Sequence, residues 1–167
     1  MCKSVKIIFL DIDGVLNNLY TKENFEGFVF VEDEKILFLK EIIESTNAQV
    51  VLSSTWRKGW FYKDHDNSYN GEEVWLFEAL QEKLNEYGIE FFDYTEEFGC
   101  RGEEILKWLE NYDGEQIESY VVIDDCDEEE LHQHLTQFVQ TYIEEGLTEV
   151  HVEQAIRLLN KECFYGK

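Results

Sequence analysis

Proline is absent from the 167 residues, and no linker, repeat or low-complexity segment divides the chain. Nothing therefore marks a domain boundary, and a chain of this length can bury about 70% of its unfolded surface in one core. Long apolar runs are missing as well. The first apolar stretch ends at Leu10, too early for the core of a signal peptide, and no segment is long enough to span a bilayer. We expect a single domain over residues 1–167, without membrane contact and located in the cytoplasm.

Basic residues are scarce, with 14 lysines and arginines against 37 acidic residues and a net charge of -23. Such a charge repels polyanions, so we expect neither a stable complex with nucleic acid nor binding to an anionic membrane. The four cysteines lack any Cys-x-x-Cys spacing, which predicts reduced thiols rather than a zinc site or a disulfide framework. The hydrophobic content of 44% nevertheless excludes a disordered chain.

Short apolar runs alternate with segments in which apolar residues recur at helical spacing. The pattern predicts strands at residues 5–10, 49–52, 89–92, 120–123 and 138–142, and helices at residues 32–44, 72–87, 102–111, 127–135 and from Thr148 onward. Residues 14–31 suit a loop or small hairpin, and residues 56–71 suit a loop. This alternation favours a three-layer, doubly wound, Rossmann-like α/β fold with a mostly parallel sheet. Both loop segments are too short for a large cap domain, so we expect a minimal cap or none.

Two carboxylates separated by one residue follow the first apolar run. Asp11 and Asp13 would point to the same side of extended backbone, at the carboxyl end of a strand, where open α/β sheets bind ligands. An EF-hand calcium loop starting at Asp11 would need Gly at its sixth position and Glu at its twelfth. This chain has Leu16 and Lys22 there, so that alternative fails. A pair of solvated turn aspartates remains the other interpretation of this motif.

Oxygen-bearing side chains also follow two further strands. Ser53 and Ser54 come after residues 49–52, and Asp124 and Asp125 come after residues 120–123. A shared site at one sheet edge explains this recurrence, and carboxylates there suit Mg²⁺ together with a substrate phosphate. One aspartate could then attack phosphorus to form an aspartyl-phosphate, while another transfers protons. The pattern therefore favours a Mg²⁺-dependent phosphomonoester hydrolase.

These residues resemble the motifs of the haloacid dehalogenase (HAD) superfamily of aspartate-nucleophile phosphatases. Residues 11–15, Asp-Ile-Asp-Gly-Val, are similar to its first motif, Ser53 to its second, and Asp124-Asp125 to its fourth. The resemblance implies that Asp11 is the nucleophile and that Asp13 is the general acid/base. It further implies a serine that contacts the phosphoryl oxygens, here Ser53 assisted by Ser54. The metal ligands expected on this basis are Asp11, Asp13, Asp124 and Asp125.

The third motif of that superfamily supplies a cation. It places Lys, or less often Arg, before the helix that precedes the fourth motif, and this chain has Arg101 there. A guanidinium at that point would hold the transferred phosphoryl group bidentately. An exposed loop arginine is the alternative interpretation, and Lys58 is the substitute cation. His132 and His134 are two residues apart on an expected helix, so we expect surface positions rather than a metal pair.

The chain also resembles a narrower branch, the HAD domains of Swiss Army Knife RNA repair proteins. The stretches that carry this resemblance are Phe-Leu-Asp-Ile-Asp-Gly-Val-Leu-Asn, Leu-Ser-Ser-Thr-Trp-Arg, Arg-Gly-Glu-Glu-Ile, Val-Val-Ile-Asp-Asp and Glu-Gly-Leu-Thr. It implies removal of phosphate from RNA ends.

Near Ser53 the sequence has a basic island of Arg57, Lys58 and Lys63, which could contact a phosphate. The neighbouring aromatic residues Trp56, Trp60 and Phe61 either stack on a base or are buried. We expect a nucleotide or a nucleic-acid end as substrate. A phosphorylated small molecule such as a sugar phosphate is the alternative, and a non-catalytic acidic protein that mimics nucleic acid is the rival class.

Overall fold

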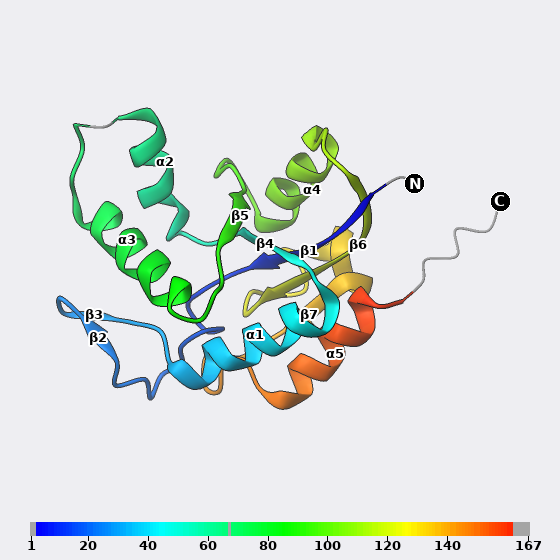
Figure 1. The fold of residues 1–167 in the computed structure, drawn as a ribbon, viewed down its shortest axis with the longest axis horizontal. Helices are drawn as coiled ribbons and strands as arrows, with labels where there is room; N and C mark the ends of the chain where they lie inside the picture. Colours follow the sequence, from blue (N-terminus) through cyan, green and yellow to red (C-terminus); the bar gives the residue numbers. More distant parts are fainter. Residues whose placement is uncertain (1–2, 67, 162–167) are drawn as a thin grey trace.

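The structure, a computed structural model, describes residues 3–66 and 68–161. Its centre is a five-stranded parallel sheet with the order β5-β4-β1-β6-β7 (Figure 1). The strands are β1 (Ser4–Leu10), β4 (Gln49–Leu52), β5 (Phe91–Tyr94), β6 (Gln116–Asp124) and β7 (Phe138–Gln140). Leu10 at the end of β1 pairs with Leu52 on one side and Ile123 on the other. The strand order reverses at β1, which is the place where doubly wound sheets bind ligands.

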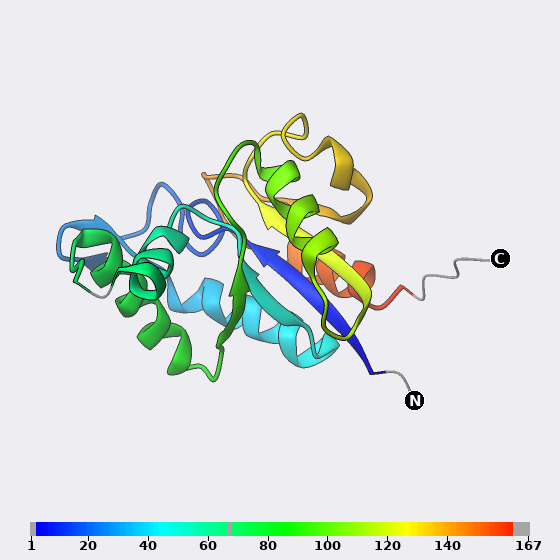
Figure 2. The same cartoon turned by 90° about the horizontal axis from the view of Figure 1, so that it is seen from above.

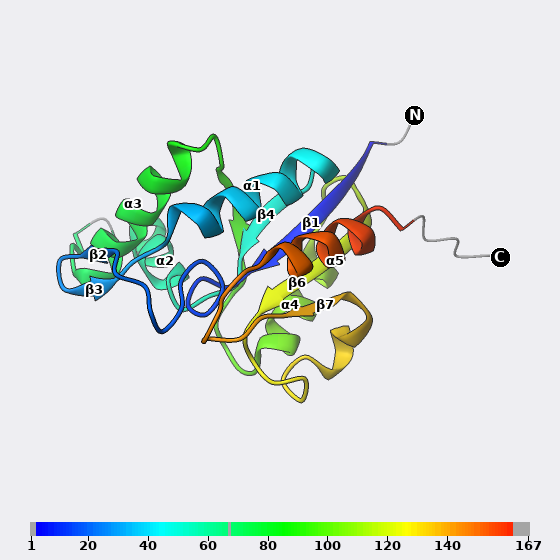
Figure 3. The ribbon, with the colours of Figure 1, turned by 90° about the horizontal axis from the view of Figure 1, so that it is seen from below.

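Helices cover both faces of this sheet and bury two apolar cores. Figure 3 shows α1 (Asp33–Thr46) and α5 (Glu149–Leu159) side by side on one face, and Figure 2 shows α4 (Arg101–Asn111) on the other. The larger core joins the first face to α3 (Glu72–Asn85), and the smaller one packs Phe9 against Trp108 of α4. Strand β4 after Gln49 and the carboxyl-terminal halves of β1 and β6 are buried on both faces, which explains their continuous apolar runs. The expected three-layer α/β fold is confirmed.

The local signals for turns and caps agree with the structure at two points. Residues 14–31 contain a small hairpin, β2 (Asn24–Phe25) and β3 (Phe28–Val29), turned by Glu26 and Gly27 with φ of 50° and 91°. Positive φ at both central residues gives the twist that a two-residue hairpin turn needs. At the last helix, Thr148 is the N-cap, and its backbone N–H donates to His151 Nδ1 at 3.1 Å.

The expected loop at residues 56–71 is wrong, because this segment contains the helix α2 (Arg57–His65). Its apolar residues do not follow a clear helical period, and its stability comes from packing against α3. Trp60 stacks on Phe77 with 5.4 Å between ring centroids. Gly59 permits this close approach, since a Cβ on it would lie 2.0 Å from the Glu73 carbonyl oxygen. Tertiary contacts therefore override a weak local pattern.

The expected helix at residues 127–135 is also wrong. Turns at residues 128–131 lead into a 3₁₀ helix, η1 (His132–Gln137). His134 is buried rather than on the surface, with its Nε2 2.8 Å from the Gly102 carbonyl oxygen and its Nδ1 2.9 Å from the Tyr120 hydroxyl. Burial lowers the pKa of His134. This neutral imidazole therefore ties η1 to the first turn of α4.

The strands are also displaced slightly from their expected bounds. β5 begins at Phe91 instead of residue 89, β6 begins at Gln116 instead of residue 120, and β7 ends at Gln140 instead of residue 142. The early part of β6 is only partly apolar because it pairs with the exposed start of β1. Among the described residues, no helix combines the length and apolarity needed to cross a membrane.

Candidate active site

The backbone ladder of the sheet extends one residue beyond four strands. The amide N–H of Asp11 donates to Ile123 O at 3.0 Å, and that of Ser53 donates to Leu10 O at 2.8 Å. Thr95 and Thr141 make the corresponding bonds after β5 and β7, at 3.1 and 2.9 Å. The first residue after each of these strands is therefore fixed by the sheet itself. This arrangement sets Asp11 and Ser53 side by side at the carboxyl edge.

Three carboxylates meet at this edge. Asp11, Asp124 and Asp125 each offer one oxygen, and these oxygens all lie within 4.8 Å of one another. Asp11 is 7% exposed and Asp124 is 1% exposed. Gly14 allows Asp125 to approach, since a Cβ on Gly14 would lie 2.2 Å from Asp125 Oδ2, and its φ of 75° also favours glycine. A buried acidic cluster of this kind could bind a metal ion.

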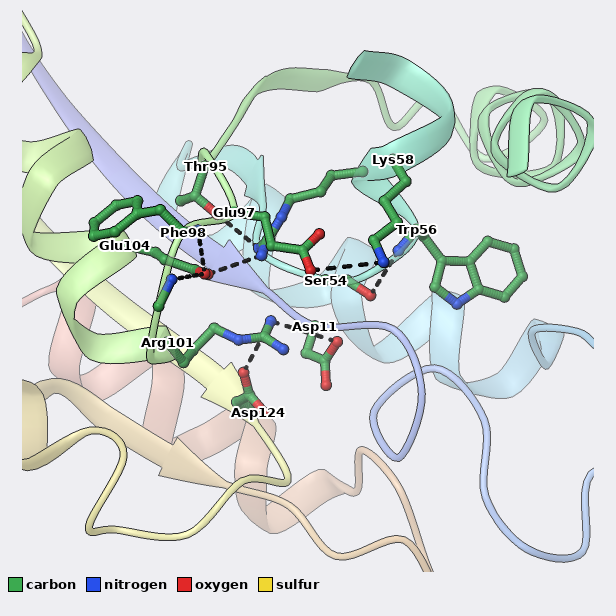
Figure 4. A network of polar contacts seen from close by, with 12 residues as sticks. Asp11, Ser54, Trp56, Lys58, Thr95, Glu97, Phe98, Arg101, Glu104 and Asp124 are labelled. Atoms are coloured by element: carbon green, nitrogen blue, oxygen red, sulfur yellow. Dashed lines mark hydrogen bonds and ion pairs between the residues drawn. The ribbon is translucent and has the colours of Figure 1, made fainter. Parts of the chain in front are cut away.

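Arg101 supplies the positive charge beside this cluster. Its Nη1 lies 3.4 Å from Asp124 Oδ2 and 3.7 Å from Asp11 Oδ1, and Figure 4 shows the guanidinium between the two carboxylates. Burial alone would lower the pKa of Arg101, but Asp124 and Asp11 raise it above its usual value. Lys58, the substitute cation, is instead paired with Glu97 at 3.6 Å. Of the two cations considered from the sequence, Arg101 is the one that forms ion pairs with the cluster.

The electrostatics of the cluster favour an added cation. Burial and the Asp124 charge raise the pKa of Asp11 to about 7, and burial and the Asp11 charge raise that of Asp125 to about 6. Burial also raises the pKa of Asp124. A hydrogen bond from Ser54 and the charge of Arg101 act in the opposite direction on Asp11. One guanidinium does not offset three crowded carboxylates, so a divalent metal would stabilise their ionised forms.

Several buried polar atoms at this edge have no hydrogen-bond partner within the described part of the chain. Three of them are Ser53 Oγ, Asp124 Oδ2 and Arg101 Nη1. The fourth is Arg57 Nε, on a residue close to Ser53 in the sequence. Buried polar groups in folded proteins are almost always hydrogen-bonded. Ser53 Oγ has no hydrogen bond, and Arg101 Nη1 and Asp124 Oδ2 meet only as an ion pair at 3.4 Å, so all three atoms retain hydrogen-bonding capacity for a metal or an oxyanion.

Asp13 lies outside the acidic cluster and is held by different partners. Trp56 Nε1 donates to Asp13 Oδ2 at 3.0 Å, and Asn17 Nδ2 donates to Asp13 Oδ1 at 2.9 Å. Asn17 Oδ1 also accepts the Gly14 N–H at 2.9 Å, which fixes the turn after β1. The side chain of Asp13 is therefore oriented, but the structure does not bring it to the carboxylates expected to share a metal with it.

Sequence reasoning missed the residues that support this turn. Asn17 ends the stretch Phe-Leu-Asp-Ile-Asp-Gly-Val-Leu-Asn that carries the family resemblance, but its contact with Asp13 was not predicted. Thr141, after β7, donates its hydroxyl to the Gly14 carbonyl oxygen at 2.7 Å, and no local pattern marks it. Trp56 was considered for base stacking or burial; it is half-buried against the larger core, and its Nε1 also orients Asp13.

The basic island expected near Ser53 does not form a free cationic surface, so this prediction is wrong. Arg57 is 4% exposed, and its Nη2 donates to Glu104 Oε2 at 2.8 Å. Its Nη1 donates to the Thr95 hydroxyl at 3.0 Å, while Glu104 Oε1 accepts the N–H groups of Phe98 and Gly99 (Figure 4). This Arg57–Glu104 pair joins α2, the segment after β5 and the first turn of α4. Lys63 pairs with Glu78 at 3.0 Å, so its charge is also offset.

A parallel sheet of this order, with flanking helices and an acidic cluster at its carboxyl edge, defines a HAD-like Rossmann fold. A family model described as the HAD domain in Swiss Army Knife RNA repair proteins matches residues 7–152, and the chain belongs to this family. The resemblance seen in the sequence is thereby confirmed. A search among curated proteins finds no match. The cluster of Asp11, Asp124 and Asp125 fits the active site of a HAD-type phosphohydrolase.

Proposed function

We propose that this protein is a Mg²⁺-dependent phosphomonoester hydrolase that acts through an aspartyl-phosphate on Asp11. The observation that carries this proposal is the set of buried atoms without a hydrogen bond on Ser53, Arg101 and Asp124, around the three clustered carboxylates. A phosphoryl group needs hydrogen-bond donors, and a metal needs oxygen ligands. Both needs are met within one sheet edge.

The residues present fit a hard divalent cation. Asp11, Asp124 and Asp125 would hold it, since all their ligand atoms are oxygens and Mg²⁺ prefers such ligands. When bound, the ion offsets the charge of an incoming phosphate. Asp124 Oδ2 accepts no hydrogen bond from the described residues and lies 3.4 Å from Arg101 Nη1, so its remaining lone pairs can bind a metal. Asp13 is not included in this ligand set, because its carboxylate is hydrogen-bonded elsewhere.

Two aspartates have different roles in the reaction. An oxygen of Asp11 forms a bond to phosphorus while the bond between phosphorus and the leaving oxygen breaks, and Asp13 gives that oxygen a proton. In the second step a water attacks the same phosphorus, returns a proton to Asp13 and releases Asp11. Trp56 and Asn17 hold the Asp13 carboxylate in one orientation for both proton transfers. Arg101, with the hydroxyl groups of Ser53 and Ser54, binds the phosphoryl oxygens.

The substrate proposed is a phosphomonoester on a nucleotide or a nucleic-acid end. The family description supports this class, because it refers to RNA repair proteins. The net charge of -23 opposes long polyanions, so contact should be confined to one end and one or two phosphates. The dependence of binding on salt should then be shallow, because few counterions are released.

The test is phosphate release with and without Mg²⁺. An aryl phosphate measures phosphatase activity in general, whatever the natural substrate is. The values of kcat/KM for a 3′-phosphorylated oligonucleotide, mononucleotides and sugar phosphates then show which class of substrate is preferred. Preference for sugar phosphates would retain the hydrolase and replace the substrate. An absence of metal-dependent turnover on all of them would favour the rival class, a non-catalytic acidic binding protein.

A further inference from the structure

A cavity of about 530 Å³ lies between α2 and the segment that joins β5 to α4. Lys58, Phe61 and Tyr62 line it from α2, and Tyr94 at the end of β5 and Phe98 in the following segment line it from the opposite side. Its volume lies within the usual range for small-molecule sites. Phe61 is 45% exposed and Phe98 is 51% exposed, so both aromatic rings are accessible to a ligand.

Both walls of this cavity continue along the chain from residues of the candidate active site. On one wall, the Arg57 N–H donates to Ser54 O at 3.1 Å, which starts α2 directly after the serines. On the other wall, Gly99 precedes Arg101 by two residues. Figure 4 shows Lys58 and Glu97, both from the cavity lining, beside Ser54 and across from Arg101. A substrate with its phosphate at Arg101 can therefore extend into the cavity.

The two accessible rings are held in place by neighbours. His65 stacks on Phe61 with 4.2 Å between ring centroids and 20° between planes. Lys107 Nζ lies 4.7 Å from the centroid of the Phe98 ring. Rings that are already positioned lose little conformational freedom when a ligand stacks on them.

The charges of the side chains that line the cavity indicate whether it binds a second phosphate or an uncharged group. Arg57 is bound to Glu104, Lys58 to Glu97 and Glu96 to Lys107, so the charges of the lining are already paired. No unpaired cation of the lining is left to bind a second phosphate. An uncharged planar group fits both the charge balance and the aromatic faces.

We infer that this cavity binds the nucleobase next to the phosphate that the enzyme removes. The inference rests on the proposed function and adds to it a base subsite formed by Phe61 and Phe98. Stacking on an aromatic side chain changes affinity by about 5- to 150-fold and tolerates different bases. The subsite should therefore distinguish nucleotides from base-free sugar phosphates without reading sequence.

The test compares AMP with ribose 5-phosphate, which carries the same phosphate and sugar but no base. The wild-type kcat/KM for AMP should exceed that for ribose 5-phosphate by about tenfold or more. Phe98→Ala and Phe61→Ala should each reduce the value for AMP and leave that for ribose 5-phosphate unchanged. Phe92→Ala is the matched control, since Phe92 is 42% exposed on β5 and does not line the cavity.

Binding of AMP, measured calorimetrically on the Asp11→Asn variant, separates this inference from the proposed function. Loss of that binding in the Asp11→Asn/Phe98→Ala double variant supports the base subsite, even if the wild type hydrolyses no phosphomonoester. Equal efficiency on AMP and ribose 5-phosphate overturns it, as does AMP binding that neither Phe98→Ala nor Phe61→Ala weakens.

Discussion

Removal of the Glu104 carboxylate tests the structural role of the Arg57–Glu104 pair. Glu104→Ala would leave the buried Arg57 guanidinium without its carboxylate, and the N–H groups of Phe98 and Gly99 without their acceptor. The bonds lost measure 2.8, 3.1 and 3.3 Å, and both side chains of the pair are at most 5% exposed.

The expected loss follows from the burial of this pair. Breaking a buried ion pair from one side costs about 3 to 5 kcal/mol, because an uncompensated charge remains in a poorly hydrated place. For a chain of this size, that loss lowers the melting temperature by about 6 to 20 °C. Replacing both partners by apolar residues, as in Arg57→Met/Glu104→Leu, should cost less than either single removal, since no charge is then buried.

Urea unfolding measures these differences through the midpoint of the transition, with the slope used to check that the unfolded state is unchanged. Glu103→Ala is the matched control, since Glu103 is an exposed neighbour in the same helical turn. A loss for Glu104→Ala within about 0.5 kcal/mol of the control would refute this reasoning, because that is the range of ordinary surface substitutions. A double variant less stable than both singles would also contradict it.

The remaining predictions concern the site itself. Asp11→Asn should abolish any phospho-enzyme detectable by intact-protein mass spectrometry, whereas Asp13→Asn should slow turnover by about 10² to 10⁴-fold. Phosphate trapped on the first-strand peptide of the Asp11→Asn variant would show that the roles of nucleophile and acid/base are wrongly assigned. Arg101→Gln should reduce kcat/KM far more than Lys58→Gln, because only Arg101 reaches Asp11 and Asp124, and the opposite ranking would assign the cation to Lys58. In EDTA, the folded state holds protons on Asp11 and Asp125 up to their raised pKa values of about 7 and about 6, so the free energy of unfolding should fall between about pH 4 and 7. The Asp11→Asn/Asp125→Asn variant should flatten that fall, and an unchanged slope would mean that other groups cause it. Gly14→Ala should displace Asp125 and reduce the rise in melting temperature that Mg²⁺ produces, and an undiminished rise would show that Asp125 is not a ligand.

The sequence predicted the elements that carry strong local signals. The apolar runs before Asp11, Ser53 and Asp124 correspond to three adjacent strands, and their order along the chain was enough to place three polar strand ends at one edge. The N-cap at Thr148 was equally clear. These features are local, so they can be recognised without knowledge of the tertiary contacts.

Other parts of the site depend on contacts between distant residues, and the sequence pattern does not encode them. Arg57 and Glu104 look like surface charges in their own segments, and both become buried only where the start of α2 meets the segment after β5 and the first turn of α4. His134 is likewise buried through Gly102 and Tyr120, which are far from it in the chain. The helix α2 was missed because its stability comes from the contact of Trp60 with Phe77 rather than from an apolar stripe.

The backbone hydrogen bonds of the sheet continue past the ends of the strands. The residues held by these bonds and the residues of the cavity walls should therefore differ in local stability. The amides of Asp11 and Ser53 are bonded into the central sheet, so their hydrogen exchange should require opening of the core. The cavity walls at residues 57–65 and 96–99 lie outside this ladder and should open at lower free energy. Substitutions in these walls should therefore change the lining of the cavity while the carboxylates of Asp11, Asp124 and Asp125 keep their positions.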